Sequence, residues 1–304
     1  MAISRTQLVK ELEPGLNALF GLEYKRYENQ HAEIYTTESS DRAFEEEVML
    51  SGFANANIKA EGSGVEFDEA QETYTARYTH DTIALAFAIT EEAIEDNLYD
   101  RIASRYTKAL ARSMSNAKQV KAATPLNNGL SSIATFKSGD TVGLFSTNHA
   151  TVSGTKVKNT LTTQADLNET SLEQALIDIA GMTDEHGLRV AAKAVKMIVP
   201  SANQFAAERL LKSQGRTGTA DNDINAVVSM GMVPQGYRVN NFLTDTDSWY
   251  ITTDVPNCMK MFQRAALKTA MEGDFDTGNV RYKARERYSF GVSDYRGIFG
   301  VEGA

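Results

Sequence analysis

The segment from Thr90 to Thr124 constrains the fold most, because the sequence predicts one long helix there. Thr90 suits an N-cap, and Glu91 and Glu92 suit the positive end of a helix dipole. No glycine or proline intervenes before Pro125, and the residue before a proline disfavours helix. At a rise of 1.5 Å per residue the helix would be roughly 50 Å long. Its apolar residues follow steps of four and three and so share one face: Ile94, Leu98, Ile102, Tyr106, Leu110, Met114, Ala117 and Val120.

A helix of this length is typical of a spine that crosses a flattened domain. A coiled coil is disfavoured because the apolar steps are irregular and the chain has a single segment of this kind. The 304 residues leave room for two domains, or for one domain with extensions. Extensions are therefore expected beside the helix.

Residues 1–32 are expected to form an arm. Leu8, Leu12, Leu16 and Leu19 are spaced as one helical face, which Pro14-Gly15 interrupts. The stripe is too short to enclose a core, and exposed leucines favour aggregation. We therefore expect these leucines to pack against a neighbouring subunit.

Residues 33–89 read as strands and turns. Thr73–Thr79 and Ile83–Ile89 alternate in the manner of strands, and Gly62-Ser63-Gly64 marks a turn. The stretch from Ala54 to Gly64 consists mostly of small and polar residues and cannot bury itself. A long hairpin with so little core is marginal alone, so we expect it to need a partner surface.

The rest of the chain mixes helices and strands, which predicts an α+β protein. Residues 125–165 look like loops with short strands. Helices are expected from Ser171 to near Thr183 and from Ser201 to Ser213, the second with Phe205, Leu210 and Leu211 facing inward. The expected strands are Ala194–Val199, Tyr237–Phe242, Ser248–Thr252, Asn279–Phe290 and Gly297–Val301.

No group of residues has the spacing of a catalytic, cofactor-binding or metal site. The four histidines (His31, His80, His149 and His186) do not form a pair on one helix, so each is expected to be a surface or hydrogen-bonded residue. Ser146 and His149 share a loop but lack a nucleophile elbow. Asp274–Asn279 departs from a calcium loop, because glycine stands where a ligand is needed and position twelve is Arg285. We therefore predict a protein without enzymatic activity.

Composition excludes further classes of protein. The single cysteine, Cys258, excludes a disulfide framework, and together with Trp249 it is expected in a core. A net charge of −9 argues against a dedicated nucleic-acid binder. No apolar run approaches the ~20 residues of a membrane span, and the start lacks a signal-peptide core, so folding in the cytoplasm is expected.

The order of elements resembles the Hong Kong 97 capsid fold of tailed bacteriophages. Several stretches are similar to the Mu-type major head subunit family over roughly residues 30–300. They are the hairpin-to-helix junction at 79–99, Leu144–His149, Ser171–Leu176, Asp184–Gly187, Ile198–Pro200, Ala207–Leu211 and Asp245–Tyr250.

The resemblance implies a major capsid protein that assembles into pentamers and hexamers of an icosahedral shell around double-stranded DNA, in the host cytoplasm. It implies an arm (1–32), an extended hairpin with flanking strands (33–89), a peripheral domain with the spine helix (90–170), an axial domain (171–262) and return strands (263–304). Expected partners are a separate scaffolding protein, since the arm leaves no room for a scaffolding segment, a portal protein and, as an option, a decoration protein. DNA would be enclosed without specific binding.

Ten residues are expected at contacts between subunits: Leu8, Leu12, Leu16, Leu19, Lys59, Tyr74, Tyr78, Arg101, Arg105 and Arg112. Some relatives cross-link a hairpin lysine to a neighbour, and Lys59 lies in the hairpin, but no acid matched to that reaction is recognisable. An encapsulin-like compartment is the main alternative reading. A soluble α/β enzyme is a further one, and it would require a convergent polar site.

Overall fold

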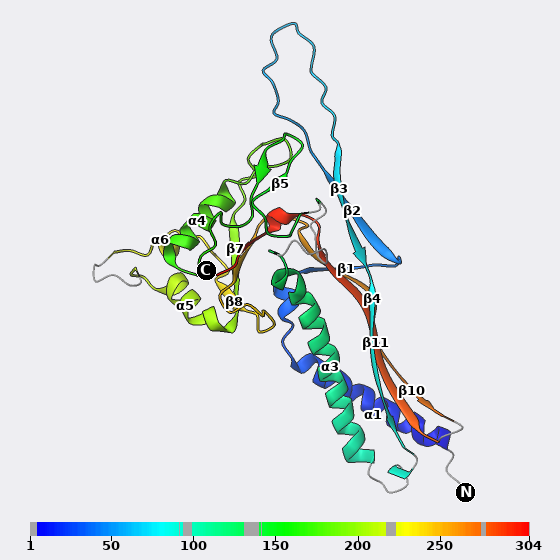
Figure 1. Ribbon diagram of the computed structural model, residues 1–304. Helices are drawn as coiled ribbons and strands as arrows, with labels where there is room; N and C mark the ends of the chain where they lie inside the picture. The colour runs from blue at the N-terminus through cyan, green and yellow to red at the C-terminus, as the bar shows by residue number, and fades with distance from the viewer. Residues whose placement is uncertain are drawn as a thin grey trace.

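The computed structural model describes residues 5–90, 92–93, 99–130, 140, 142–216, 223–274 and 278–303, and only the backbone of residues 5–12 and 99–102. Figure 1 shows an elongated molecule with three parts. One part combines the helices α1 (Arg5–Arg26) and α3 (Tyr99–Asn127) with long strands. A second part is a rounder domain that carries α4 (Glu169–Ala180), and the third is a hairpin that projects away from both.

The long helix predicted from the sequence is α3. Within its described residues, the buried face includes Ala103, Leu110 and Met114 and continues to Leu126. Tyr106 and Val120, which were predicted on this face, are exposed. The helix does not end at Thr124 as predicted but continues through Pro125 to Asn127. Two tyrosines from other parts of the chain hold its last turns. The Tyr35 hydroxyl donates to the Ala122 carbonyl, and the Tyr250 hydroxyl donates to the Leu126 carbonyl. Glu91, Ile94 and Leu98 lie outside the described residues.

A four-stranded sheet lies against α1 and α3. Its order is β1 (Thr36–Ser39), β10 (Met259–Gly273), β11 (Val280–Val292) and β4 (Asp81–Ile89). β1 pairs parallel to β10, and the other pairs are antiparallel. Along β11, Tyr282, Ala284 and Tyr288 are buried toward the helices while the alternate residues face outward. The predicted strands Ile83–Ile89 and Asn279–Phe290 are thus confirmed with slightly different ends.

The second sheet forms the core of the rounder domain. Its order is β12 (Ile298–Val301), β9 (Trp249–Thr253), β7 (Ala194–Val199) and β8 (Tyr237–Val239). Trp249 is fully buried, as predicted, among residues of β7, β12 and α4. Cys258 is also buried, and burial raises the pKa of its thiol, which keeps it protonated and unreactive.

The helices beside this sheet correct two expectations. α4 begins with a capping box in which Asn168 is the N-cap and Ser171 the third helical residue, so the helix starts before Ser171. Leu172, Leu176 and Ile179 are buried as predicted. In α5 (Gln204–Lys212), Leu210 is buried but Phe205 is exposed, so the inward orientation predicted for Phe205 was wrong.

The remaining elements are short. They are η1 (Gln30–Glu33), β5 (His149–Ala150), β6 (Lys156–Val157), η2 (Ser201–Asn203), α6 (Ala226–Ser229) and η3 (Tyr295–Gly297). Among the described helices, none combines the length and the apolar character needed to cross a membrane.

Candidate assembly interface

The projecting hairpin is the part of the chain that packs least against itself. β2 (Phe44–Leu50) pairs antiparallel with β3 (Glu72–Thr79), which includes the strand predicted at Thr73–Thr79. Every residue from 52 to 72 is exposed. The tip closes with a turn in which the Ser63 amide donates to the Ala60 carbonyl, close to the predicted position. Two polar contacts hold the limbs together, from the Ala54 amide to Asp68 and from Asn57 to Glu66.

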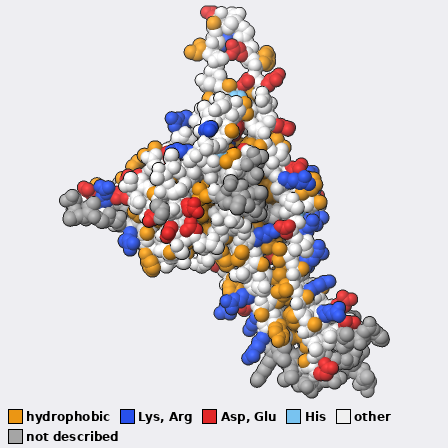
Figure 2. Space-filling view, viewed as in Figure 1, with side chains coloured by type: hydrophobic (Ala, Val, Ile, Leu, Met, Phe, Trp, Pro, Cys, Tyr) orange, Lys and Arg blue, Asp and Glu red, His pale blue; other side chains and the backbone are white. Residues whose placement is uncertain are grey.

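Large apolar side chains stand on this hairpin without cover. Phe53 is 60% exposed, Phe67 is 97% exposed, and Ile58 and Val65 are similarly free. Figure 2 shows such side chains beside acidic ones at the tip of the projection. Isolated apolar residues are common on surfaces, but a slender projection that carries four of them is typical of a segment that is buried in an assembly.

The root of the hairpin, in contrast, is fixed in its own subunit. Tyr78 is 3% exposed and packs edge-on against Phe262 of β10 at 4.8 Å between ring centroids. Gly291 of β11 makes room for the ring, since a Cβ there would lie 2.5 Å from a Tyr78 ring carbon. Tyr74 packs against the core of the rounder domain. Both tyrosines therefore have contacts within the chain, and their predicted contact with a neighbouring subunit stays a prediction.

Charged groups reinforce the root. The buried Lys260 ammonium forms ion pairs with Glu47 of β2 and with Glu38 of β1, the latter at 3.0 Å. Glu47 also accepts a hydrogen bond from Ser293, which bonds in turn to the Tyr78 hydroxyl. These contacts join the hairpin to β1, to β10 and to the residue that follows β11, so the hairpin is held where it leaves the body.

The arm helix also packs on its own subunit. Leu16 and Phe20 are buried with Ile89, Leu110 and Tyr282. Asn17 accepts hydrogen bonds from Thr269 and Tyr282, each at 2.7–2.8 Å. α1 runs unbroken through Pro14-Gly15, where we expected an interruption. Within the chain, the sheet and α3 cover Leu16, and its contact with a neighbouring subunit stays a prediction.

The other predicted contact residues lie at or near the surface, or have side chains that the structure does not describe. Arg105 and Arg112 are exposed on α3, Lys59 is exposed near the hairpin tip, and Leu19 is half-buried. The side chains of Leu8, Leu12 and Arg101 are among those that the structure does not describe.

Three buried ion pairs, at two places, hold the body together. Lys118 of α3 contacts Glu286 of β11 at 3.1 Å, and the Tyr24 hydroxyl of α1 donates to the same carboxylate at 3.4 Å. In the rounder domain, Arg296 contacts Glu185 at 2.6 Å and Asp294 at 3.3 Å. Burial raises the pKa of Asp294, although the neighbouring guanidinium opposes that effect. The pairs Lys118–Glu286 and Arg296–Glu185 link segments that are distant in the sequence.

The polar residues that could suggest catalysis have structural contacts instead. His149 is fully buried, stacks on Tyr295 at 3.8 Å, and bonds to Asp140 and to Asn159. No hydrogen bond between Ser146 and His149 occurs among the described contacts. His31 bonds to Gln119, and burial lowers its pKa to about 4. These two histidines are hydrogen-bonded, as expected. Within the described residues, no cluster of His, Cys, Asp or Glu could hold a metal ion.

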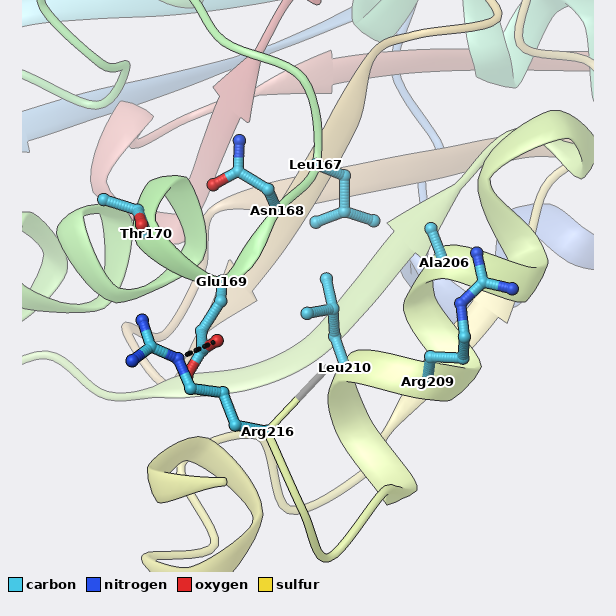
Figure 3. A pocket seen from close by; sticks show the side chains of 8 residues that line it. All are labelled: Leu167, Asn168, Glu169, Thr170, Ala206, Arg209, Leu210 and Arg216. Atoms are coloured by element: carbon cyan, nitrogen blue, oxygen red, sulfur yellow. Dashed lines mark hydrogen bonds and ion pairs between the residues drawn. The ribbon is translucent and has the colours of Figure 1, made fainter. Parts of the chain in front are cut away.

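A surface hollow between α4 and α5, with a volume of about 600 Å³, is lined by polar and charged side chains as well as apolar ones. Figure 3 shows Arg216 paired with Glu169, at 2.9 Å, so their charges compensate each other. Leu167, Leu210, Ala206 and Arg209 also line the hollow. Among the described residues that line it, no nucleophile lies beside a base.

Comparisons with known proteins agree with a structural role. The family model described as "Phage capsid protein" matches residues 73–301. No curated protein matches the chain in sequence. Among solved structures, the chain is similar to a virus-like particle from Pyrococcus furiosus, with 11% identity, a TM-score of 0.56 and coverage of 94% of this chain and 98% of that one.

Two phage structures show the same fold. The capsid of Myoviridae phage XM1 is 11% identical, with a TM-score of 0.54 and 89% of each chain covered. The procapsid of bacteriophage JBD30 is 12% identical, with a TM-score of 0.53 and coverage of 99% of this chain and 77% of that chain. The family match spans most of the sequence, and the fold agrees with it. This chain belongs to the phage capsid protein family, and it is a structural protein of the capsid shell, not an enzyme.

Proposed function

We propose that copies of this chain assemble as pentamers and hexamers that close into an icosahedral head around double-stranded DNA. The observation that carries this proposal is the hairpin, whose apolar residues Phe53, Ile58, Val65 and Phe67 are exposed while its root is fixed. Burial of such a side chain is worth about 1.5–3 kcal/mol. A neighbouring subunit that covers the hairpin would therefore contribute substantially to assembly.

Within this proposal the elongated part of the molecule is the peripheral domain of a Hong Kong 97-like fold of the Mu type. The rounder part is the axial domain, near the capsomer axis. The boundaries proposed from the sequence are retained: arm 1–32, hairpin 33–89, peripheral domain 90–170, axial domain 171–262 and return strands 263–304. The resemblance of the sequence landmarks to that family supports this division.

The predicted contacts between subunits stay in the proposal: Leu8, Leu12, Leu16, Leu19, Lys59, Tyr74, Tyr78, Arg101, Arg105 and Arg112. Leu16, Tyr74 and Tyr78 also pack within their own chain. The arginines of α3 whose side chains are described, Arg105 and Arg112, are exposed and available to carboxylates of a neighbour.

The capsid is the location of the protein in the virion, and assembly in the host cytoplasm is part of the proposal. Further proposed partners are a separate scaffolding protein, a portal protein and, as an option, a decoration protein. A net charge of −9 suits a container for DNA. A strongly basic interior would hold the phosphate backbone and oppose release.

Assembly of the purified full chain tests the proposal. Sedimentation velocity and negative-stain electron microscopy should show closed shells that Phe53→Ser/Phe67→Ser reduces strongly. Phe205→Ser is the matched control, because Phe205 is also exposed but lies on α5. A monodisperse monomer under all conditions, or equal assembly of the hairpin variant and the control, would contradict the proposal. Small uniform shells without DNA during expression would favour an encapsulin-like compartment.

A further inference from the structure

Two arginines lie where the root of the hairpin meets the first sheet. Arg287 of β11 pairs with Ala265 of β10, and the adjacent pair is Tyr288 with Gln263. Arg264 is therefore the extra residue of a β-bulge, a feature that often redirects a side chain. Both arginine side chains are half-buried. We call Arg264 and Arg287 the arginine pair.

His80 brings the arginine pair to one place. It separates β3 from β4 and is 5% exposed. Its Nδ1 atom bonds to the Ser289 hydroxyl at 3.0 Å, and Ser289 follows Arg287 by two residues on the same face of β11. Burial lowers the pKa of His80 most, and the positive charges of Arg287 and Arg264 lower it further. Both guanidinium groups therefore lie near the same imidazole.

The arginine pair has no anionic partner within the part of the chain that the structure describes. The Nε atoms of Arg264 and Arg287 are buried, and each N–H donates to no acceptor. Buried donors without an acceptor are rare in proteins and costly. The two guanidinium groups also repel each other. An anion bound between them would remove both costs.

The carboxylates nearest to His80 are engaged elsewhere. Glu45 and Asp81 are the two whose negative charges oppose the lowering of its pKa. Glu45 accepts a hydrogen bond from the Ser40 hydroxyl at 2.7 Å, and Asp81 forms an ion pair with Lys121. Neither pairs with an arginine, so an anion for the arginine pair would have to come from outside this chain.

The chemistry of the two groups favours a tetrahedral oxyanion. A guanidinium presents its N–H groups as a planar fork that binds two oxygens of a phosphate or carboxylate. A phosphate dianion can serve both forks at once, whereas a lone carboxylate can serve only one. A long polyanion such as DNA is disfavoured, because Glu45 and Asp81 lie beside the pair and the chain carries a net charge of −9.

We propose that the arginine pair is a binding site for inorganic phosphate at the root of the hairpin. The phosphate accepts hydrogen bonds from both guanidinium groups and compensates their charges. Because Ser289 bonds to His80 beside the site, the bound ion also holds the junction of β3 and β4 against β11. The inference goes beyond the proposed assembly and does not depend on it, since the site lies within one subunit.

Thermal unfolding of unassembled full-length chain tests the site. Sodium phosphate replaces sodium chloride at constant ionic strength, and the melting temperature should rise with phosphate concentration, because a ligand of the folded chain stabilises it. Arg264→Gln should weaken the phosphate affinity by about ten-fold or more, since hydrogen bonds to a charged group are lost. Arg285→Gln is the matched control, because Arg285 is exposed on the same face of β11 and should not affect the affinity.

Phosphorus-31 NMR of phosphate titrated with the chain measures binding directly, so that wild type and Arg264→Lys decide the question even if Arg264→Gln folds poorly. Arg264→Lys keeps the charge but loses the fork, and it should bind phosphate more weakly than wild type. Phosphate should also slow hydrogen exchange in residues 78–82.

The inference is overturned if phosphate and chloride give the same melting temperature, or if the Arg264 variants bind phosphate as well as Arg285→Gln does. Binding of double-stranded DNA without binding of free phosphate would assign the arginine pair to DNA. Loss of shells in Arg264→Gln, without phosphate binding in wild type, would assign it to a carboxylate of another subunit. Either result would also overturn the inference.

Discussion

Replacement of Lys118 by methionine should destabilise the subunit strongly, because it leaves Glu286 charged and buried. The Glu286 side chain is 1% exposed, and one of its carboxylate oxygens contacts Lys118 at 3.1 Å. The other oxygen has no hydrogen-bond partner in the described structure. Loss of one partner of a buried ion pair costs about 3–5 kcal/mol. For a chain of this size that corresponds to a fall in melting temperature of about 6–10 °C.

Lys121→Met is the matched control on the same helix. Lys121 pairs with Asp81, whose side chain is 57% exposed, so loss of that pair should cost less than about 1 kcal/mol. Both ammonium groups lie over the Tyr288 ring, at 5.0 Å for Lys118 and 5.8 Å for Lys121. The two variants therefore lose a similar contact with the ring. They differ mainly in the carboxylate left without a cation, which is buried for Glu286 and exposed for Asp81.

The double variant Lys118→Met/Glu286→Met completes the test. Replacement of a whole buried ion pair by apolar residues is often neutral or stabilising, so the double variant should be more stable than Lys118→Met alone. Thermal unfolding of unassembled subunits, followed by circular dichroism, measures all three variants. The reasoning would be refuted if Lys118→Met and Lys121→Met melted within about 2 °C of each other.

Four further predictions concern α3, the hairpin, the arm helix and His31. Leu110→Pro should cost about 3 kcal/mol or more and yield insoluble chain, and soluble chain that forms shells would contradict a continuous α3. Deletion of residues 54–64 should leave the melting temperature of the subunit nearly unchanged while shells fail to form, and loss of the fold would count against an exposed hairpin. Phe20→Ala should destabilise the free subunit by about 3–5 kcal/mol. An unchanged melting temperature would indicate that the arm packs on a neighbouring subunit instead of its own. His31 has a folded-state pKa of about 4 and an unfolded value near 6.5, so its contribution of up to about 3 kcal/mol is present above pH 6.5 and is lost as pH falls toward 4. In His31→Gln, unfolding in denaturant at pH 7 and pH 4.5 should show that this pH dependence has disappeared.

The periodic elements could be predicted from the sequence because local spacing determines them. The stripe through Leu110 and Met114 identified α3, and the alternation after Thr82 identified β4. The end of α3 was missed because Pro125 lies in a last turn that Tyr35 and Tyr250 hold from distant parts of the chain. Such tertiary contacts override a local stop signal.

β10 shows the limit of local reasoning most clearly. Residues 263–304 were expected to contain return strands, but the bounds of β10 were not predicted. Its second half, from Ala265 to Glu272, is rich in Ala, Lys, Met and Glu, which favour helix. It is a strand because β11 pairs with it over almost its full length and β1 pairs with its first residues. Strand propensity depends on such neighbours more than on the segment itself.

The candidate interface was predictable only in part, because some of its residues are positioned by contacts with distant parts of the chain. Sequence composition identified a hairpin that cannot cover itself, and the exposure of residues 52–72 agrees with that. It could not distinguish Tyr78 of the root from Phe67 of the limb, since both are aromatic residues of one hairpin. Their difference arises from Phe262 and Gly291, which are distant in the sequence and form the site that encloses the Tyr78 ring.

This contrast between root and tip has a mechanical consequence. A projection that docks on a neighbour transmits force to its own subunit only if its base does not yield. The base is held by Lys260, by Tyr78 on Phe262 and by Ser293, which belong to or contact the long strands β10 and β11. The same two strands run the length of the first sheet, which is backed by α1 and α3, and the buried pair of Lys118 and Glu286 fixes α3 to that sheet. A load on the hairpin would therefore pass into the best-supported part of the subunit.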